Sequence, residues 1–168
     1  MNIKKLNKEL SKLMNESEYN DVWQQVERFD SNFIKAVKEI AKELDWNINT
    51  YALHPNNNLH VAMSGVFSIW PSIIDNYTTV IYILSTRIAT EYLSDAGLKP
   101  INTEIAIPLS STEHEIYEKL KAAINDTKLI EFMKTWYAYR NSAAYDRKKR
   151  EIDSFVYRKG KYDDIEVL

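Results

Sequence analysis

The chain contains no cysteine and few of the residues that interrupt regular structure, with three glycines and four prolines in 168 residues. Without cysteine it has no disulfide bond, no thiolate metal site and no cysteine nucleophile. So few glycines and prolines do not suit a fold of many short strands joined by tight turns. These absences favour helices as the main elements.

A long uninterrupted apolar run is also missing. The most apolar window, residues 72–93, is broken by Asp75, Asn76, Arg87 and Glu91, so we predict no membrane span and no membrane partner. The first twenty residues are basic but lack the apolar stretch of about 7–15 residues that marks a secretion signal. We therefore expect a cytoplasmic protein.

The composition is that of a folded protein. Hydrophobic residues make up 45% and charged residues 27% of the chain, which is typical of a globular rather than a disordered sequence. The length suits one domain with a continuous core. We predict a single helical domain over residues 1–168, with residues 146–168 either loosely packed or forming a disordered basic tail.

Apolar residues recur at helical spacing in several segments. The most regular stripe begins at Val22 and ends at Leu44. A further element is predicted to start near residue 59, with a break or kink near Trp70, caused by Pro71, and then a long helix to about residue 95. These patterns predict an all-α fold, an irregular bundle of five or six helices, with a minor C-terminal hairpin at Lys159–Gly160 as an option. The expected core contains Val26, Phe29, Phe33, Val80, Leu84, Leu129, Met133 and Trp136.

Three shorter signals refine this prediction. Residues 2–14 form a short amphipathic segment, and residues 101–109 alternate in a way that also fits an extended segment. Thr112 and Glu115 have the spacing of a capping box at the start of a further helix.

Positive charge gathers near the C-terminus. Residues 134–161 carry nine Lys and Arg against three acids, a net charge of +6 in a chain of net charge −2. Such asymmetry permits contact with an anionic partner, although basic residues also favour the C-terminal ends of helices. The candidate residues for a protein partner or a polyanion are Arg147, Lys148, Lys149, Arg150, Arg158, Lys159 and Lys161.

Arg140 has a structural interpretation. On a continuous helix it lies within about 60° of Leu129, Met133 and Trp136, which places it on the apolar stripe. A buried charge must be paired, and Glu91 is the candidate partner, although Glu91 could instead pair with Arg87 one turn earlier.

Arg140 also has a catalytic interpretation, because the segment "RNSAAY" (residues 140–145) resembles the start of the R-x(4–6)-H motif of HEPN domains. These are small all-α proteins that include many prokaryotic RNases and toxin components. In that family the arginine and the histidine act together on an RNA phosphate, often across a dimer interface, so the resemblance implies an RNase site centred on Arg140 and Asn141. Tyr145 stands where that family has histidine, and tyrosine is a poor base at neutral pH. The resemblance therefore implies an inactive or differently organised member.

Other chemistry has little support. His114 and Glu118 lie one helical turn apart and could share a metal, but an exposed helix surface explains them better. His54 and His60 fit no familiar metal motif, and the chain has no phosphate-binding glycine loop. We expect no metal and no cofactor.

Two function classes remain. The favoured one is a non-catalytic binding or regulatory protein, such as a small defence-, immunity- or phage-type factor, that contacts a macromolecule. A protein is the preferred partner, nucleic acid is the alternative through residues 140–161, and a homo-oligomer is compatible with the sequence. The other class is a HEPN-like RNase, or a degenerate toxin or antitoxin component, that uses Arg140, Asn141 and Tyr145.

Overall fold

The fold mixes helices with an antiparallel sheet. A computed structural model of the chain describes residues 16–50, 61–63, 65–76 and 78–167. The contacts divide the chain into two compact units, residues 1–87 with 101–129 and residues 88–100 with 130–168. The prediction of an all-α bundle is wrong, because the chain also contains an antiparallel sheet, and a single domain stays a prediction.

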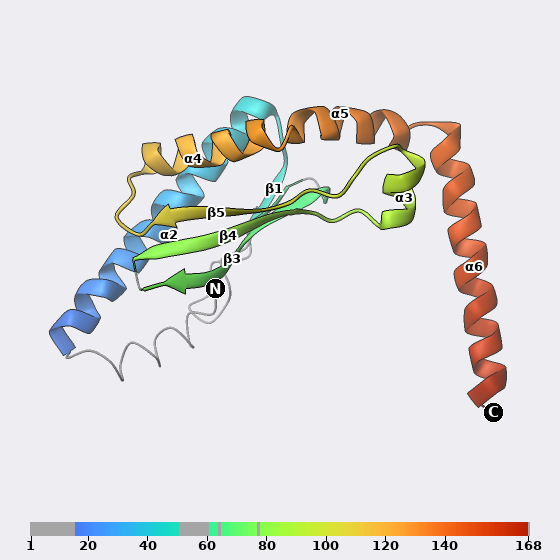
Figure 1. Ribbon diagram of the computed structural model, residues 1–168, viewed down its shortest axis with the longest axis horizontal. Helices are drawn as coiled ribbons and strands as arrows, with labels where there is room; N and C mark the ends of the chain where they lie inside the picture. The colour runs from blue at the N-terminus through green and yellow to red at the C-terminus, as the bar shows by residue number, and fades with distance from the viewer. Residues whose placement is uncertain (1–15, 51–60, 64, 77, 168) are drawn as a thin grey trace. The chain divides into compact units, whose positions relative to one another are not determined.

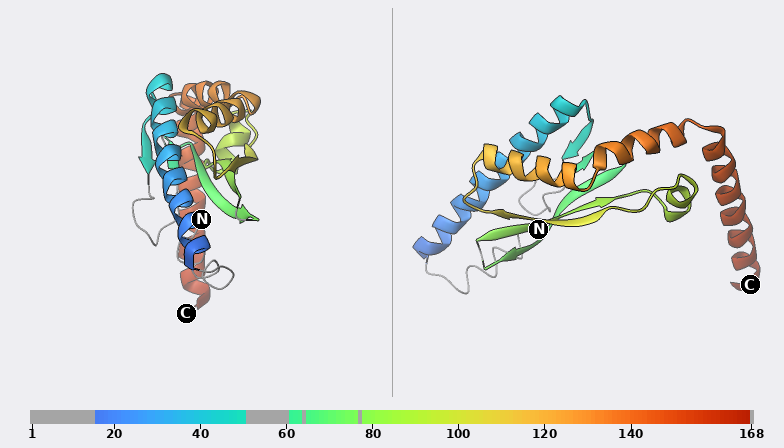
Figure 2. Two further views of the ribbon diagram at one scale, coloured as in Figure 1. Left: turned by 90° about the vertical axis from the view of Figure 1, so that its left-hand side faces the viewer. Right: turned by 45° about the horizontal axis from the view of Figure 1, so that its top comes forward.

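The first unit is a sheet with helices on one face (Figures 1 and 2). Its strands are β1 (Ile48–Thr50), β2 (Val61–Met63), β3 (Phe67–Asp75), β4 (Thr79–Thr86) and β5 (Asn102–Pro108), and its helices are α2 (Glu16–Leu44) and α4 (Glu113–Asp126). The five strands pair antiparallel in chain order. The two helices pack against each other over the sheet.

The core of this unit lies between α2 and the middle of the sheet. The ring of Phe33 stacks on that of Tyr82 at a centroid distance of 4.3 Å, and Phe29 stacks on both. All three side chains are almost fully buried. All eight residues that the sequence places in the core are buried, so that prediction is confirmed.

The helix predicted between residues 59 and 95 is instead β2, β3, β4 and the short helix α3 (Thr90–Asp95). Val80, Tyr82 and Leu84 are buried on the face below α2, while Ile81 and Ile83 are half-buried on the other face. Because both faces of β4 are apolar, the alternation is hidden and the residues also fit a helical stripe. The β-branched side chains prefer a strand.

Pro71 lies in β3 and does not break a helix. On one side Pro71 pairs with Tyr82 of β4. On the other side, the pairing of β3 with β2 ends at Ile69, before the proline. The register shifts between Pro71 and Ile73, and such irregularities are where a sheet accepts proline.

Both helices of the first unit follow their sequence signals. Helix α2 ends at the predicted Leu44, and α4 begins with the predicted capping box. The hydroxyl of Thr112 accepts from the amide of Glu115 over 3.2 Å, while the carboxylate of Glu115 accepts from the amide of Thr112 over 3.4 Å.

The second unit contains α3, α5 (Leu129–Arg140) and α6 (Ala143–Val167). The first residue of α5, Leu129, belongs to the first unit. Four aromatic rings meet in it: Tyr92, Trp136, Tyr139 and Tyr145. The hydroxyl of Tyr139 donates to Asp95 over 2.7 Å. Burial and this hydrogen bond raise the pKa of Tyr139.

The C-terminal hairpin is a wrong prediction, because α6 continues as a helix through Lys159 and Gly160. A glycine inside a helix costs only about 1 kcal/mol. The predicted amphipathic segment at residues 2–14 lies outside the described residues. In the described part of the chain, no helix is both long enough and apolar enough to cross a membrane.

Candidate functional site

Strand β5 is an edge of the sheet. Strand β4 lies along one side of it, and within the described ranges no strand pairs with its other side. The amide of Thr86 donates to the carbonyl of Ile101 over 3.0 Å, and the amide of Leu109 donates to the carbonyl of Thr78 over 2.8 Å. These two hydrogen bonds, one at each end of β5, show that the odd-numbered residues of this segment direct their N–H and C=O groups toward β4.

Every second residue of β5 directs its backbone groups away from β4, because these groups alternate along a strand. The outward residues are Asn102, Glu104, Ala106 and Pro108. Pro108 has no N–H to donate. Because its backbone faces away from β4, no hydrogen bond between the two strands is lost. The N–H groups of Glu104 and Ala106 form no hydrogen bond to any described residue. These two N–H groups are therefore free to bond an added strand.

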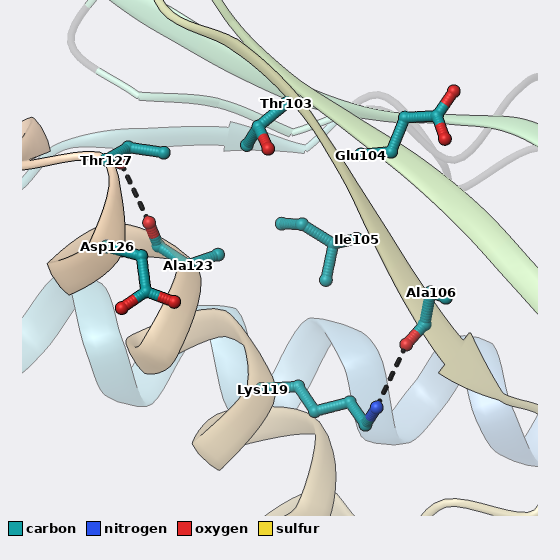
Figure 3. A pocket seen from close by; sticks show the side chains of 8 residues that line it. All are labelled: Thr103, Glu104, Ile105, Ala106, Lys119, Ala123, Asp126 and Thr127. Carbon is teal, nitrogen blue, oxygen red and sulfur yellow. Dashed lines mark hydrogen bonds between the residues drawn. The ribbon is translucent and has the colours of Figure 1, made fainter.

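A hollow of about 290 Å³ lies between this edge and α4 (Figure 3). Ile105 reaches into its centre from β5, and Ala123 lines it from α4. We refer to the open edge of β5 together with this hollow as the β5 groove. An extended chain placed along the edge would direct alternate side chains toward α4.

Three side chains of α4 line the β5 groove in a row: Lys119, Ala123 and Asp126. They lie about one helical turn apart, so they share a face of the helix. The ammonium of Lys119 donates to the carbonyl oxygen of Ala106 over 3.2 Å. Lys119 and Asp126 are both exposed, and neither forms an ion pair within the described part of the chain.

Helix α4 is held in place from its other side. Ile116, Leu120 and Ile124 are buried in the first unit. The hydroxyl of Tyr117 donates to the carboxylate of Glu43 on α2 over 2.7 Å, and this hydrogen bond raises the pKa of Tyr117 to about 12. One wall of the β5 groove therefore belongs to the core of the unit.

The helix ends at the groove. Thr127 follows the last residue of α4, and its hydroxyl donates to the carbonyl of Ala123 over 2.8 Å. Lys128 then takes a positive φ of 55°, which stops the helix. The carboxylate of Asp126 and the negative end of the helix dipole thus lie together at this end of the groove.

The structure contradicts the buried position expected for Arg140. The residue is exposed and ends α5, and its guanidinium lies over the ring of Tyr145 at 4.2 Å from the centroid. Glu91 is also exposed, and no ion pair joins the two within the described residues. An exposed cation–π contact contributes about 0.5–1 kcal/mol, well below the 3–5 kcal/mol expected on breaking a buried ion pair.

Arg140 lies on the apolar side of α5 in a helical projection, but it is the last residue of the helix, where its side chain is exposed. The hydroxyl of Ser142 accepts from the amide of Tyr145 over 3.3 Å and donates to the carbonyl of Tyr139 over 2.6 Å. The break at Asn141 and Ser142 ends α5 at Arg140, so the helical wheel of α5 does not extend to Tyr145. Asn141 itself is exposed.

The structure describes the side chains of four of the seven basic candidates, and these four do not share one face of α6. Arg147, Lys149 and Arg150 are exposed, whereas Lys148 is half-buried and lies 3.4 Å from the carboxylate of Glu151. Four consecutive helical residues point in four directions about 100° apart. The side chains of Arg158, Lys159 and Lys161 lie outside the described residues.

The metal candidates remain simple surface groups. His114 lies 3.6 Å from Glu118, and both side chains are exposed. Among the described residues, no group of three or more metal-binding side chains occurs. His54 and His60 lie outside the described residues.

A second polar feature lies inside the first unit. One carboxylate oxygen of Asp30 and the hydroxyl of Tyr82 are buried, and neither forms a hydrogen bond in the described part of the chain. Burial raises the pKa of Asp30 to about 7. Burial and the nearby Asp30 charge also raise the pKa of Tyr82.

None of the site residues predicted from the sequence lies in the β5 groove. Two signals were present: the alternation from Ile101 to Leu109, and Pro108 at the end of that run. A proline and a charged residue within an alternating segment are typical of an edge strand.

Comparison with models of protein families, with curated proteins and with solved structures gives no significant match. The candidate site therefore rests on its geometry.

Proposed function

We propose that the protein is a non-catalytic binding protein that captures an extended segment of a protein partner in the β5 groove. The observation that carries this proposal is the open edge of β5 beside the hollow against α4. A regulatory role of the kind expected from the sequence would act through this contact.

Strand addition supplies both affinity and selectivity at such a site. The N–H and C=O groups of Glu104 can exchange two hydrogen bonds with one residue of an incoming antiparallel strand. Side chains at alternate positions of that strand would enter the hollow between Ile105 and Ala123. Backbone bonds then provide affinity, and the hollow selects the side chains.

A protein partner is preferred to nucleic acid because of how charge is distributed. Among the described side chains of α6, the exposed basic residues Arg147, Lys149 and Arg150 are interspersed with the exposed acids Asp146, Glu151 and Asp153. A groove that tracks a phosphate backbone needs positive charge along one surface. The mixed fold also differs from the all-α architecture of HEPN domains, so the resemblance gives an RNase no structural support.

Glu104→Pro tests the proposal, because it removes one outward N–H and leaves the ladder to β4 intact. Peptides selected from a random displayed library on the wild type are expected to bind the variant about tenfold or more weakly. Glu104→Thr is the matched control, since it removes the same charge but keeps the N–H, and it should retain binding. Titration calorimetry measures the three affinities, and circular dichroism checks the fold.

Ala123→Leu provides a second test that leaves the strand unchanged. The larger side chain fills the hollow and should weaken the same peptides by a similar factor. Equal binding to the wild type, Glu104→Pro and Ala123→Leu would contradict the proposal, as would failure of the library to yield any binding peptide.

A further inference from the structure

The two ends of the β5 groove carry opposite charges. Lys119 lies at the end formed by Ala106, where its ammonium contacts the outward carbonyl. Asp126 lies at the end formed by Thr103, next to Thr127 and the last carbonyls of α4. Between them, Ala123 and Ile105 form an apolar centre (Figure 3).

The spacing of these three sites matches an extended chain. Lys119 and Asp126 are seven residues apart on α4, which corresponds to about 10 Å along the helix axis. Side chains on one face of a strand repeat about every 6.6 Å, so the first and third of them lie about 13 Å apart. Lysine and aspartate side chains can make up the small difference.

The pairing pattern determines which partner residues enter the groove. The side chains of Thr103, Ile105 and Ile107 lie on the face that the helices cover. Directly opposed residues of an added strand point to the same face as their partners. Partner residues opposite Ile107, Ile105 and Thr103 therefore face Lys119, the hollow and Asp126.

We propose that the partner segment binds antiparallel to β5 and carries an acidic, an apolar and a basic side chain at alternate positions; this inference rests on the proposed function. In the order from its N-terminus, the acidic group pairs with Lys119, the apolar group fills the hollow, and the basic group pairs with Asp126. Antiparallel addition continues the pattern of the sheet, whose described strands all pair in that way.

Lys119 can serve a bound carboxylate without leaving the edge. An ammonium has three donors, of which the contact with Ala106 uses one. A second copy of this chain fits the groove less well. Two β5 strands centred on Glu104 would place two carboxylates opposite each other, which is unfavourable.

Two peptides of equal composition test the inference. Each is threonine-based with valine in the centre; one has aspartate two residues before the valine and lysine two residues after it, and the other has the two charges exchanged. The wild type should bind the first about tenfold more tightly. The double variant Lys119→Asp with Asp126→Lys should reverse the preference, measured by NMR titration.

Equal affinities in the wild type would overturn the inference, as would a preference that the double variant leaves unchanged. If library peptides still bind and still lose affinity on Glu104→Pro, the proposed function stands without this charge pattern. A dimer that sedimentation detects in the wild type and Glu104→Pro abolishes would also overturn it, since the occupant would then be a second copy.

Discussion

Replacing Trp136 with alanine is expected to destabilise the second unit by about 3–5 kcal/mol, the range for removing a buried aromatic side chain. Trp136 is 8% exposed and lies edge-on to both Tyr92 and Tyr145. Its loss would remove the contacts that join α3, α5 and α6. Urea denaturation followed by circular dichroism measures the change in the free energy of unfolding.

Tyr137 provides the control for this prediction. It is the next residue on α5, but its side chain is 40% exposed. Tyr137→Ala should change stability by no more than about 0.5 kcal/mol. If Trp136→Ala cost less than about 1 kcal/mol, Trp136 would belong to the surface.

Raising the pH from about 4 to 7 is expected to lower the stability of the first unit by up to about 4 kcal/mol. The cause is Asp30, whose pKa burial raises from 3.8 to about 7. Between these two values the folded state keeps a proton that the unfolded state has released. Stability therefore falls as pH rises through this window and levels off above pH 7.

Asp30→Asn should remove this dependence, because the amide has a similar shape and does not ionise. The variant is expected to match the wild type near pH 4 and to exceed it in stability above pH 7. Its amide also adds a hydrogen-bond donor near the hydroxyl of Tyr82, which has no hydrogen-bond partner in the described part of the chain. Asp21→Asn is the control, since Asp21 is an exposed acid on the same helix. A wild-type curve that stays flat from pH 4 to 7 would rule out this role of Asp30.

The sequence predicts helices well where one face alone is apolar. The stripe of α2 from Val26 to Leu44 leaves a polar opposite face, so its period is clear. Strand β4 has apolar residues on both faces, and its period of two is masked. A local signal for the β3–β4 turn was available: Asp75 and Asn76 separate two β-branched runs, and Asn76 takes a positive φ of 48°.

The candidate site depends on strand order, which a single sequence does not reveal. The alternation around Ile105 predicts an extended segment, and Pro108 is typical of an edge. Neither indicates that β5 is last in the sheet or that α4 returns beside it. Arg140 shows the same limit, because the sequence places it on the apolar stripe of α5 but does not show that the helix ends there, where the side chain is exposed.

Amide hydrogen exchange along β5 tests the central claim most directly, because it reports whether the outward edge is open and whether a bound strand closes it. In the free protein, the amides of Thr103, Ile105 and Ile107 should exchange slowly, while those of Glu104 and Ala106 exchange fast. A selected peptide should slow exchange at Glu104 by at least about tenfold and leave Ile105 unchanged. If Glu104 is as protected as Ile105 in the free protein, or if peptide binding leaves its exchange unchanged, the β5 groove is not the binding site.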